Sequence, residues 1–253
     1  MEKTFLAQDD FVGISFWIAT AVMAAGTLFF FFERSTVKKE WQTSLTVAAL
    51  VCFVAFWHYL YMRGAWVDSA YVNGVFAEGQ GKSPTVYRYI DWLITVPMQI
   101  VEFYLILAAC TAVSLRVFWN LLVGSLVMLV GGYAGEAELW GISHMTGFII
   151  GMVGWIYIIY YVFAGEAAKL KDSAGNENLA LAFNGIKWIV TIGWAIYPIG
   201  YYLGYLVLDA EGNPAGASDG LNIVYNLADL INKFLFGLVI WYAAMRDSGV
   251  SKG

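Results

Sequence analysis

Long stretches of hydrophobic residues alternate with short polar segments along the whole chain. A helix that crosses a lipid bilayer needs about 20 mostly apolar residues. Seven stretches meet this requirement, at residues 11–32, 43–63, 85–109, 117–135, 142–164, 181–208 and 221–245. Because the connections between them are short, we expect an all-α membrane protein, a single domain of residues 1–253 built as a bundle of seven transmembrane helices.

The second connection, residues 67–83, is the longest. Its segment YVNGVF (residues 71–76) places Asn-Gly between two pairs of strand-forming residues, which predicts a short β-hairpin. Pro97 and Pro198 fall inside expected helices. Each proline frees a carbonyl group four residues earlier and favours a kink in its helix.

The composition excludes several classes of protein. Hydrophobic residues make up 60% of the chain and charged residues only 13%, whereas a soluble domain is about one quarter charged. The net charge of −5 and the lack of a basic tract argue against nucleic acid as a partner. Cys52 and Cys110 lie in apolar stretches and form no metal-binding or disulfide pattern. The first residues show no signal-peptide pattern.

The orientation in the membrane follows from the basic residues, which concentrate in cytoplasmic connections. One side of the expected bundle carries Arg34, Lys38, Lys39, Arg116, Lys169, Lys171, Arg246 and Lys252. The other side has three basic residues and collects acids, namely Asp9, Asp10, Asp68, Glu78, Glu136, Glu138, Asp209, Glu211 and Asp219. We therefore expect the N-terminus outside and the C-terminus in the cytoplasm.

Ionisable residues inside the expected helices are the candidates for function, since each charge at membrane depth costs about 2.5–3.5 kcal/mol. Asp91 and Glu102 are eleven residues apart, so they share one helix face with about 16 Å of rise between them. Two acids at different depths are typical of a proton relay. Asp229 and Lys233 are one turn apart in the seventh helix, where the amine is either salt-bridged or covalently modified. Structural ion pairs, a proton-coupled transporter and a receptor-like bundle remain alternatives.

Several motifs in the right order extend this interpretation. RYIDWLITVP (Arg88–Pro97) followed by Glu102, WAIYPIGY (Trp194–Tyr201) and YNLADLINK (Tyr225–Lys233) resemble microbial rhodopsins, most closely the blue-absorbing proteorhodopsins. FWHYLYMR (Phe56–Arg63) and GSLVMLVGGYAGE (Gly124–Glu136) extend the resemblance into the second and fourth helices.

The resemblance implies a light-driven outward proton pump, not an enzyme, in a bacterial cytoplasmic membrane. Lys233 would hold all-trans retinal as a protonated Schiff base, with Asp91 as counterion and proton acceptor and Asp229 as second counterion. Arg88 would lie nearby, and Glu102 would be the cytoplasmic proton donor. The triplet Asp91, Thr95 and Glu102 is similar to that of outward proton pumps. A slow-cycling photosensory rhodopsin that signals to a separate partner is the alternative.

The same resemblance assigns further roles. Gln99 matches a position of spectral tuning and implies absorption of blue light, and His58 would hydrogen-bond to the acceptor carboxylate. Trp17 of a neighbouring copy would reach His58 in a homo-pentamer or homo-hexamer. Phe148 stands where carotenoid-binding relatives carry glycine, so we expect no carotenoid antenna. The residues that would line the retinal pocket are Trp92, Met128, Trp155, Trp194, Tyr197, Pro198, Tyr201 and Tyr225.

Overall fold

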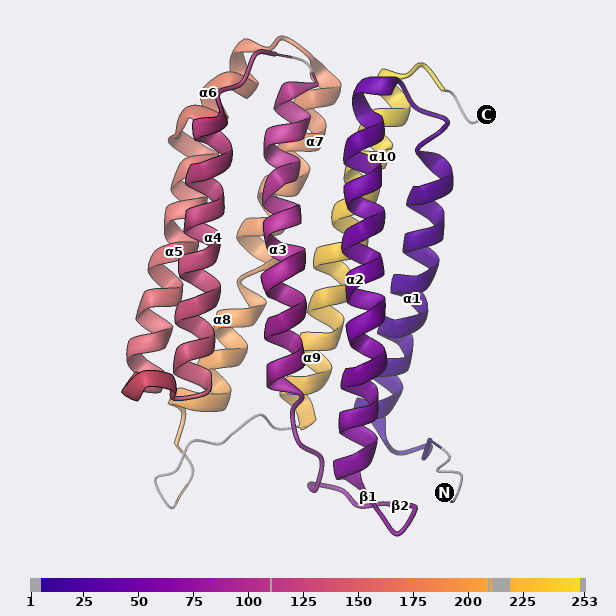
Figure 1. Cartoon of the computed structure of the whole chain (residues 1–253), viewed down its shortest axis with the longest axis vertical. Helices are drawn as coiled ribbons and strands as arrows, with labels where there is room; N and C mark the ends of the chain where they lie inside the picture. Colours follow the sequence, from indigo (N-terminus) through magenta and orange to yellow (C-terminus); the bar gives the residue numbers. More distant parts are fainter. Residues whose placement is uncertain (1–5, 110, 209, 211–218, 251–253) are drawn as a thin grey trace.

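Seven helical spans form one bundle in the computed structural model, which describes residues 6–109, 111–208, 210 and 219–250 (Figure 1). The acids Asp209 and Glu211, the basic residues Lys3 and Lys252, and Cys110 lie outside the described residues. The first four spans are α1 (Phe11–Glu33), α2 (Lys39–Ala70), α3 (Thr85–Ala108) and α4 (Leu115–Glu136). The short 3-10 helix η1 (Leu139–Gly141) leads to the fifth span, α5 (His144–Ala164), which continues as α6 (Glu166–Ser173).

The sixth and seventh spans are each built from several segments. The sixth contains α7 (Glu177–Trp188), the π-helix η2 (Ile189–Gly193), α8 (Ile196–Tyr201) and the π-helix η3 (Tyr202–Leu206). The seventh contains α9 (Asp219–Asp229), the π-helix η4 (Leu230–Leu235) and α10 (Phe236–Asp247). The seven expected spans are therefore confirmed.

The two internal prolines behave differently. The sixth span is interrupted by a turn at Trp194 and Ala195, directly before the segment that contains Pro198. Pro198 deprives the carbonyl group of Trp194 of the N–H four residues later, and this carbonyl accepts the N–H of Tyr197 (3.2 Å) instead. The kink predicted at Pro198 thus coincides with an interruption of the helix. Helix α3, in contrast, continues through Pro97 without a break in its assignment.

The outer hairpin is anchored to the first span. Strands β1 (Tyr71–Val72) and β2 (Val75–Phe76) pair in antiparallel fashion around Asn73 and Gly74, whose φ angles are 53° and 80°. Asp10 caps α1 by accepting the N–H of Gly13 (2.7 Å), and its carboxylate also accepts the hydroxyl of Tyr71 (3.0 Å). Burial raises the pKa of Tyr71, which keeps this hydroxyl a donor to Asp10.

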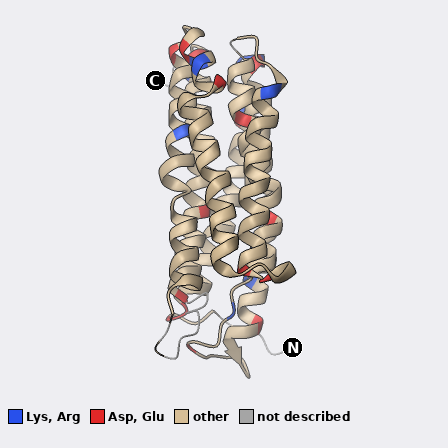
Figure 2. Ribbon diagram, turned by 90° about the vertical axis from the view of Figure 1, so that its left-hand side faces the viewer, with Lys and Arg blue, Asp and Glu red and all other residues tan. Residues whose placement is uncertain are grey.

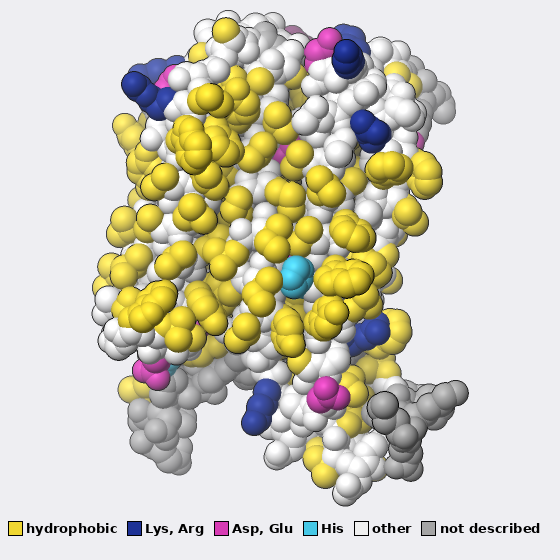
Figure 3. Space-filling model, viewed as in Figure 1, with side chains coloured by type: hydrophobic (Ala, Val, Ile, Leu, Met, Phe, Trp, Pro, Cys, Tyr) yellow, Lys and Arg dark blue, Asp and Glu magenta, His cyan; other side chains and the backbone are white. Residues whose placement is uncertain are grey.

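The outer surface of the bundle is apolar over most of its height. Figure 2 shows that charged side chains concentrate at the two ends, with a few inside the bundle. Hydrophobic side chains cover the middle of the face drawn in Figure 3. Large residues such as Phe32, Trp119 and Ile192 are more than half exposed on the outside of the spans, as expected for side chains in contact with lipid.

Close contact between α4 and α5 positions one wall of the interior. A Cβ atom on Gly154 would lie only 2.7 Å from the carbonyl oxygen of Gly124 and 2.8 Å from the Cα of Met128. Only glycine allows α5 to approach α4 so closely at this point. The approach fixes Met128 beside the interior cavity described below.

Candidate functional site

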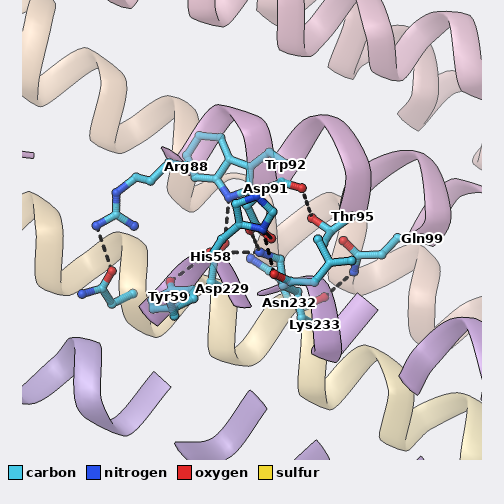
Figure 4. Close-up of polar contacts among 12 residues, drawn as sticks. His58, Tyr59, Arg88, Asp91, Trp92, Thr95, Gln99, Asp229, Asn232 and Lys233 are labelled. Atoms are coloured by element: carbon cyan, nitrogen blue, oxygen red, sulfur yellow. Dashed lines mark hydrogen bonds and ion pairs between the residues drawn. The ribbon is translucent and has the colours of Figure 1, made fainter. Parts of the chain in front are cut away.

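The centre of the bundle holds a buried amine between two carboxylates. Nζ of Lys233, in η4, donates to Oδ2 of Asp229 (3.0 Å), one turn earlier, and to Oδ2 of Asp91 on α3 (Figure 4). The three side chains are at most 2% exposed. Burying a charge is costly unless an opposite charge compensates it, so the two acids explain how an amine is held at this depth.

The two carboxylates differ in their other partners. Asp229 accepts hydrogen bonds from the hydroxyl groups of Tyr59 (2.9 Å) and Tyr197 (2.6 Å) and from Nε1 of Trp92 (3.0 Å). Oδ1 of Asp91, in contrast, has no hydrogen-bond partner within the described part of the chain. Donors stabilise the charged form of a carboxylate. Asp229 is therefore held as an anion, whereas Asp91 keeps an oxygen that can receive a proton.

Within the described residues, neither Arg88 nor His58 forms a hydrogen bond with Asp91. Nη2 of Arg88 donates to Oδ1 of Asn222 (3.0 Å) and of Asn226 (2.8 Å), and its side chain extends away from Lys233 (Figure 4). Nδ1 of His58 lies 2.8 Å from the carbonyl oxygen of Val54 and 3.9 Å from Oδ1 of Asp91. The expected His58–Asp91 hydrogen bond is therefore absent from this structure, because the ring nitrogen is engaged with the preceding turn of α2.

Thr95 and Gln99 support the backbone around the amine. Oγ1 of Thr95 donates to the carbonyl oxygen of Asp91 (2.9 Å), one turn earlier on α3. Nε2 of Gln99 donates to the carbonyl oxygen of Asn232 (2.5 Å), directly before Lys233. A π-helix disrupts the regular pattern of backbone hydrogen bonds, and Gln99 satisfies one carbonyl group in this segment.

Glu102 lies on the same helix as Asp91, toward the end of the bundle that carries the C-terminus. Its side chain is fully buried, and neither of its oxygens has a hydrogen-bond partner within the described residues. The hydroxyl of Ser44, on α2, is a polar group in its surroundings. An isolated buried carboxyl group is more stable when protonated, which suits a group that stores a proton.

A largely apolar cavity begins at Lys233 and extends between α3, α4, α5 and the sixth span. Every residue expected to line a retinal pocket borders it, as do Gln99 and Lys233. Eight further residues complete the lining, namely Tyr89, Val96, Leu129, Gly132, Glu136, Phe148, Gly151 and Met152.

Comparison with known proteins decides the family. Residues 10–246 match the family model described as bacteriorhodopsin-like protein. The chain belongs to this family. It is 52% identical over 240 residues to the blue-light absorbing proteorhodopsin of Gamma-proteobacterium Hot 75m4, which covers 95% of this chain and 88% of that relative. It is 49% identical to the green-light absorbing proteorhodopsin of Gamma-proteobacterium EBAC31A08, over 96% and 90% of the two chains.

Solved structures agree with this assignment. The crystal structure of the blue light-absorbing proteorhodopsin from Med12 matches with a TM-score of 0.76 and 55% identity, over 94% of this chain and 99% of that one. Exiguobacterium sibiricum rhodopsin matches with the same TM-score and 33% identity, over 95% and 98%. The protein is a microbial rhodopsin, as its motifs predict.

Retinal is the cofactor of this family, and the site fits it. A long apolar chain with one aldehyde group needs a hydrophobic slot that ends in an amine. The cavity provides this slot, with the rings of Trp92, Trp194 and Tyr197 in its walls and the Lys233 amine at its end. Among the lining residues, Lys233 carries the amine that the aldehyde group requires.

Glu136 is the main lining residue that sequence reasoning missed. As the last residue of α4 it was grouped with the acids of the outer connections, but its Oε1 accepts the hydroxyl of Tyr89 (2.9 Å) and its side chain borders the cavity. Glu136 lies eight residues after Met128, an expected pocket residue, so the two side chains lie on neighbouring sides of α4. This spacing is the sequence signal that identifies Glu136 as a lining residue.

Proposed function

We propose that this rhodopsin is a light-driven outward proton pump that absorbs blue light and carries all-trans retinal on Lys233. The observation that carries the proposal is the contrast between Asp91 and Asp229. Both flank the Lys233 amine, but only Asp91 has an oxygen without a hydrogen-bond partner within the described residues. The amine thus has one neighbour suited to accept its proton.

Bound retinal supplies the absorption of light and an isomerisation that changes the proton affinity of the Lys233 nitrogen. Asp91 accepts the proton of that nitrogen, and Asp229 remains an anion because the donors from Tyr59, Trp92 and Tyr197 hold its charge. Hydrogen bonds to Asn222 and Asn226 fix the position of Arg88. Its guanidinium provides positive charge on the outer side of this cluster. Glu102 then returns a proton to the nitrogen from the other side.

The direction of transport rests on the order of these groups along the membrane. Asp91 lies toward the end with few basic residues, which we assign to the outside, and Glu102 lies toward the basic, cytoplasmic end. This places the C-terminus in the cytoplasm of a bacterium whose inner membrane holds the protein. Moving each proton against 100 mV requires about 2.3 kcal/mol, which light supplies.

The absorption of blue light is proposed from Gln99. Its amide borders the cavity and donates to the carbonyl group next to Lys233. A polar group at this point stabilises the ground-state charge near the nitrogen more than the displaced charge of the excited state. The energy gap widens and absorption moves to shorter wavelength.

A ring of five or six copies is proposed from the surface of α1 and α2. Trp17 is 48% exposed on this surface, and the guanidinium of Arg63 lies 3.7 Å from the centre of its ring. The side chain of His58 is 14% exposed. A neighbouring copy could therefore reach His58 from outside the bundle.

The absence of a carotenoid antenna remains a prediction from Phe148, which borders the cavity.

Illumination of cells that express the chain with retinal, in unbuffered medium, tests the pump. We expect rapid acidification of the medium that a protonophore abolishes. Colour without acidification would support the photosensory alternative, and alkalinisation would reverse the proposed direction. Cells that express Lys233→Ala are the control, since they should remain colourless and should not respond to light.

A further inference from the structure

One carboxylate joins three spans at the end of the bundle that carries the C-terminus. Oδ2 of Asp247, the last residue of α10, accepts hydrogen bonds from Nζ of Lys38 (3.2 Å) and Nε1 of Trp41 (3.1 Å). Its Oδ1 accepts the side-chain amides of Asn176 (3.3 Å) and Asn178 (3.4 Å). The seventh span is thereby tied to the start of α2 and to the start of α7.

The contact borders a polar groove at this end of the bundle. The groove is lined by Lys38, Glu40, Ala109, Ala174, Asn176 and Asp247. Ala109 lies seven residues after Glu102, two turns along the same side of the third span. Ser44, a polar neighbour of Glu102, lies one turn from Glu40 on α2. The groove therefore lies beyond Glu102 along the same sides of the second and third spans.

Buried aromatic rings form a hydrophobic layer beside Glu102, and part of it belongs to α7. Phe183 of α7 packs edge-on against Phe103 of α3, with ring centres 5.3 Å apart, and both rings are fully buried. Phe103 directly follows Glu102. An outward movement of α7 would therefore withdraw Phe183 from its contact with Phe103, next to the buried acid.

Helix α7 is bounded by an interruption of the sixth span at its inner end. It ends at the π-helix η2, which is followed by the turn at Trp194 and Ala195. Interruptions of this kind are where helices bend. Helix α7 thus has a bending point at one end and the side-chain contacts with Asp247 at the other.

We propose that Asp247 is a latch that holds α7 closed over Glu102 and so limits the rate at which Glu102 takes up a proton. This inference rests on the proposed pump. Both oxygens of Asp247 already accept hydrogen bonds, so it is poorly suited to collect protons itself. Weakening the latch should accelerate proton uptake, whereas loss of a proton collector would slow it.

Time-resolved measurements with a pH-sensitive dye, on the full retinal-loaded chain at alkaline pH, test the latch. Asp247→Asn should accelerate proton uptake about fivefold, the scale expected for weakening one or two hydrogen bonds. Asp247→Glu, which keeps the carboxylate, should remain close to the wild type. Asp172→Asn is the matched control, because Asp172 is an exposed acid at the same end of the bundle. Proton release to the outside should not change in any variant.

Amide hydrogen exchange in the dark gives an independent readout. Residues 179–188 of α7 should exchange faster in Asp247→Asn than in the wild type, while residues 121–135 of α4 serve as an internal reference. Unchanged exchange in α7, or slower proton uptake, would overturn the latch. A wild type that releases no protons in light would contradict the proposed function. The exchange experiment would still decide whether Asp247 holds α7.

Discussion

Asp91 and Asp229 flank the same amine but are not equivalent. Tyr59, Trp92 and Tyr197 all donate to Asp229, while Asp91 has an unpartnered oxygen within the part of the chain that the structure describes. Two identical side chains at one nitrogen can thus serve different purposes. One stabilises positive charge throughout, and the other can change its protonation state.

Asp91→Asn should give a coloured protein that does not transport protons. The amide cannot accept the proton of the Lys233 nitrogen, and the loss of one negative charge destabilises the ground state of the bound chromophore. We therefore expect absorption at longer wavelength and no light-driven acidification. Spectra and pH recordings of cells check both effects, with Glu138→Gln, an exposed outer acid, as the control. Acidification at the wild-type level would exclude Asp91 as the acceptor.

Tyr59→Phe should destabilise the protein, because it removes one of the three uncharged donors to the buried carboxylate of Asp229. Hydrogen bonds to charged groups contribute about 1.5–3 kcal/mol. Thermal loss of colour should therefore occur at a lower temperature than in the wild type. Tyr61→Phe is the matched control, since Tyr61 lies on the same helix and is 51% exposed. Equal midpoints for the two variants would contradict this role of Tyr59.

The helices could be predicted because each span needs a long apolar stretch, but their ends could not. Helix α2 was expected at residues 43–63 and runs from Lys39 to Ala70. The additional turns contain Glu40 and Asp68, polar residues that a hydropathy pattern assigns to connections. Trp66 is fully buried in the last turns and donates to Asp10 of the first span. Packing, not hydropathy, extends this helix.

Helical spacing identified the charged residues of the site but not their partners. The distance of four residues between Asp229 and Lys233 predicts their contact, and the structure confirms it. The donors to Asp229 come from three other spans, and the rotation of each span about its axis follows from packing of the whole bundle. For the same reason the spacing does not show that Nδ1 of His58 lies 3.9 Å from Oδ1 of Asp91, beyond hydrogen-bond distance.

Glu102→Gln should slow the photocycle without preventing the first proton transfer. The amide cannot donate a proton, so the Lys233 nitrogen must recover its proton from water through the hydrophobic layer around Phe103. General acids contribute about 10²–10⁴-fold to the rates of proton transfer, and we expect a delay of about 10²-fold. Flash spectroscopy measures it, and added azide, a small proton carrier, should restore the rate. A recovery rate equal to that of the wild type would remove Glu102 from the pathway.

Gln99→Leu should move the absorption to longer wavelength. Leucine removes the dipole that borders the cavity and leaves the carbonyl group of Asn232 without its side-chain donor. The ground state near the Lys233 nitrogen then loses more stabilisation than the excited state. The matched control is Gln42→Leu, because Gln42 lies near the start of α2 and its amide donates to the carbonyl oxygen of Val37 instead. A spectrum that moves in neither variant, or moves equally in both, would show that Gln99 does not set the colour.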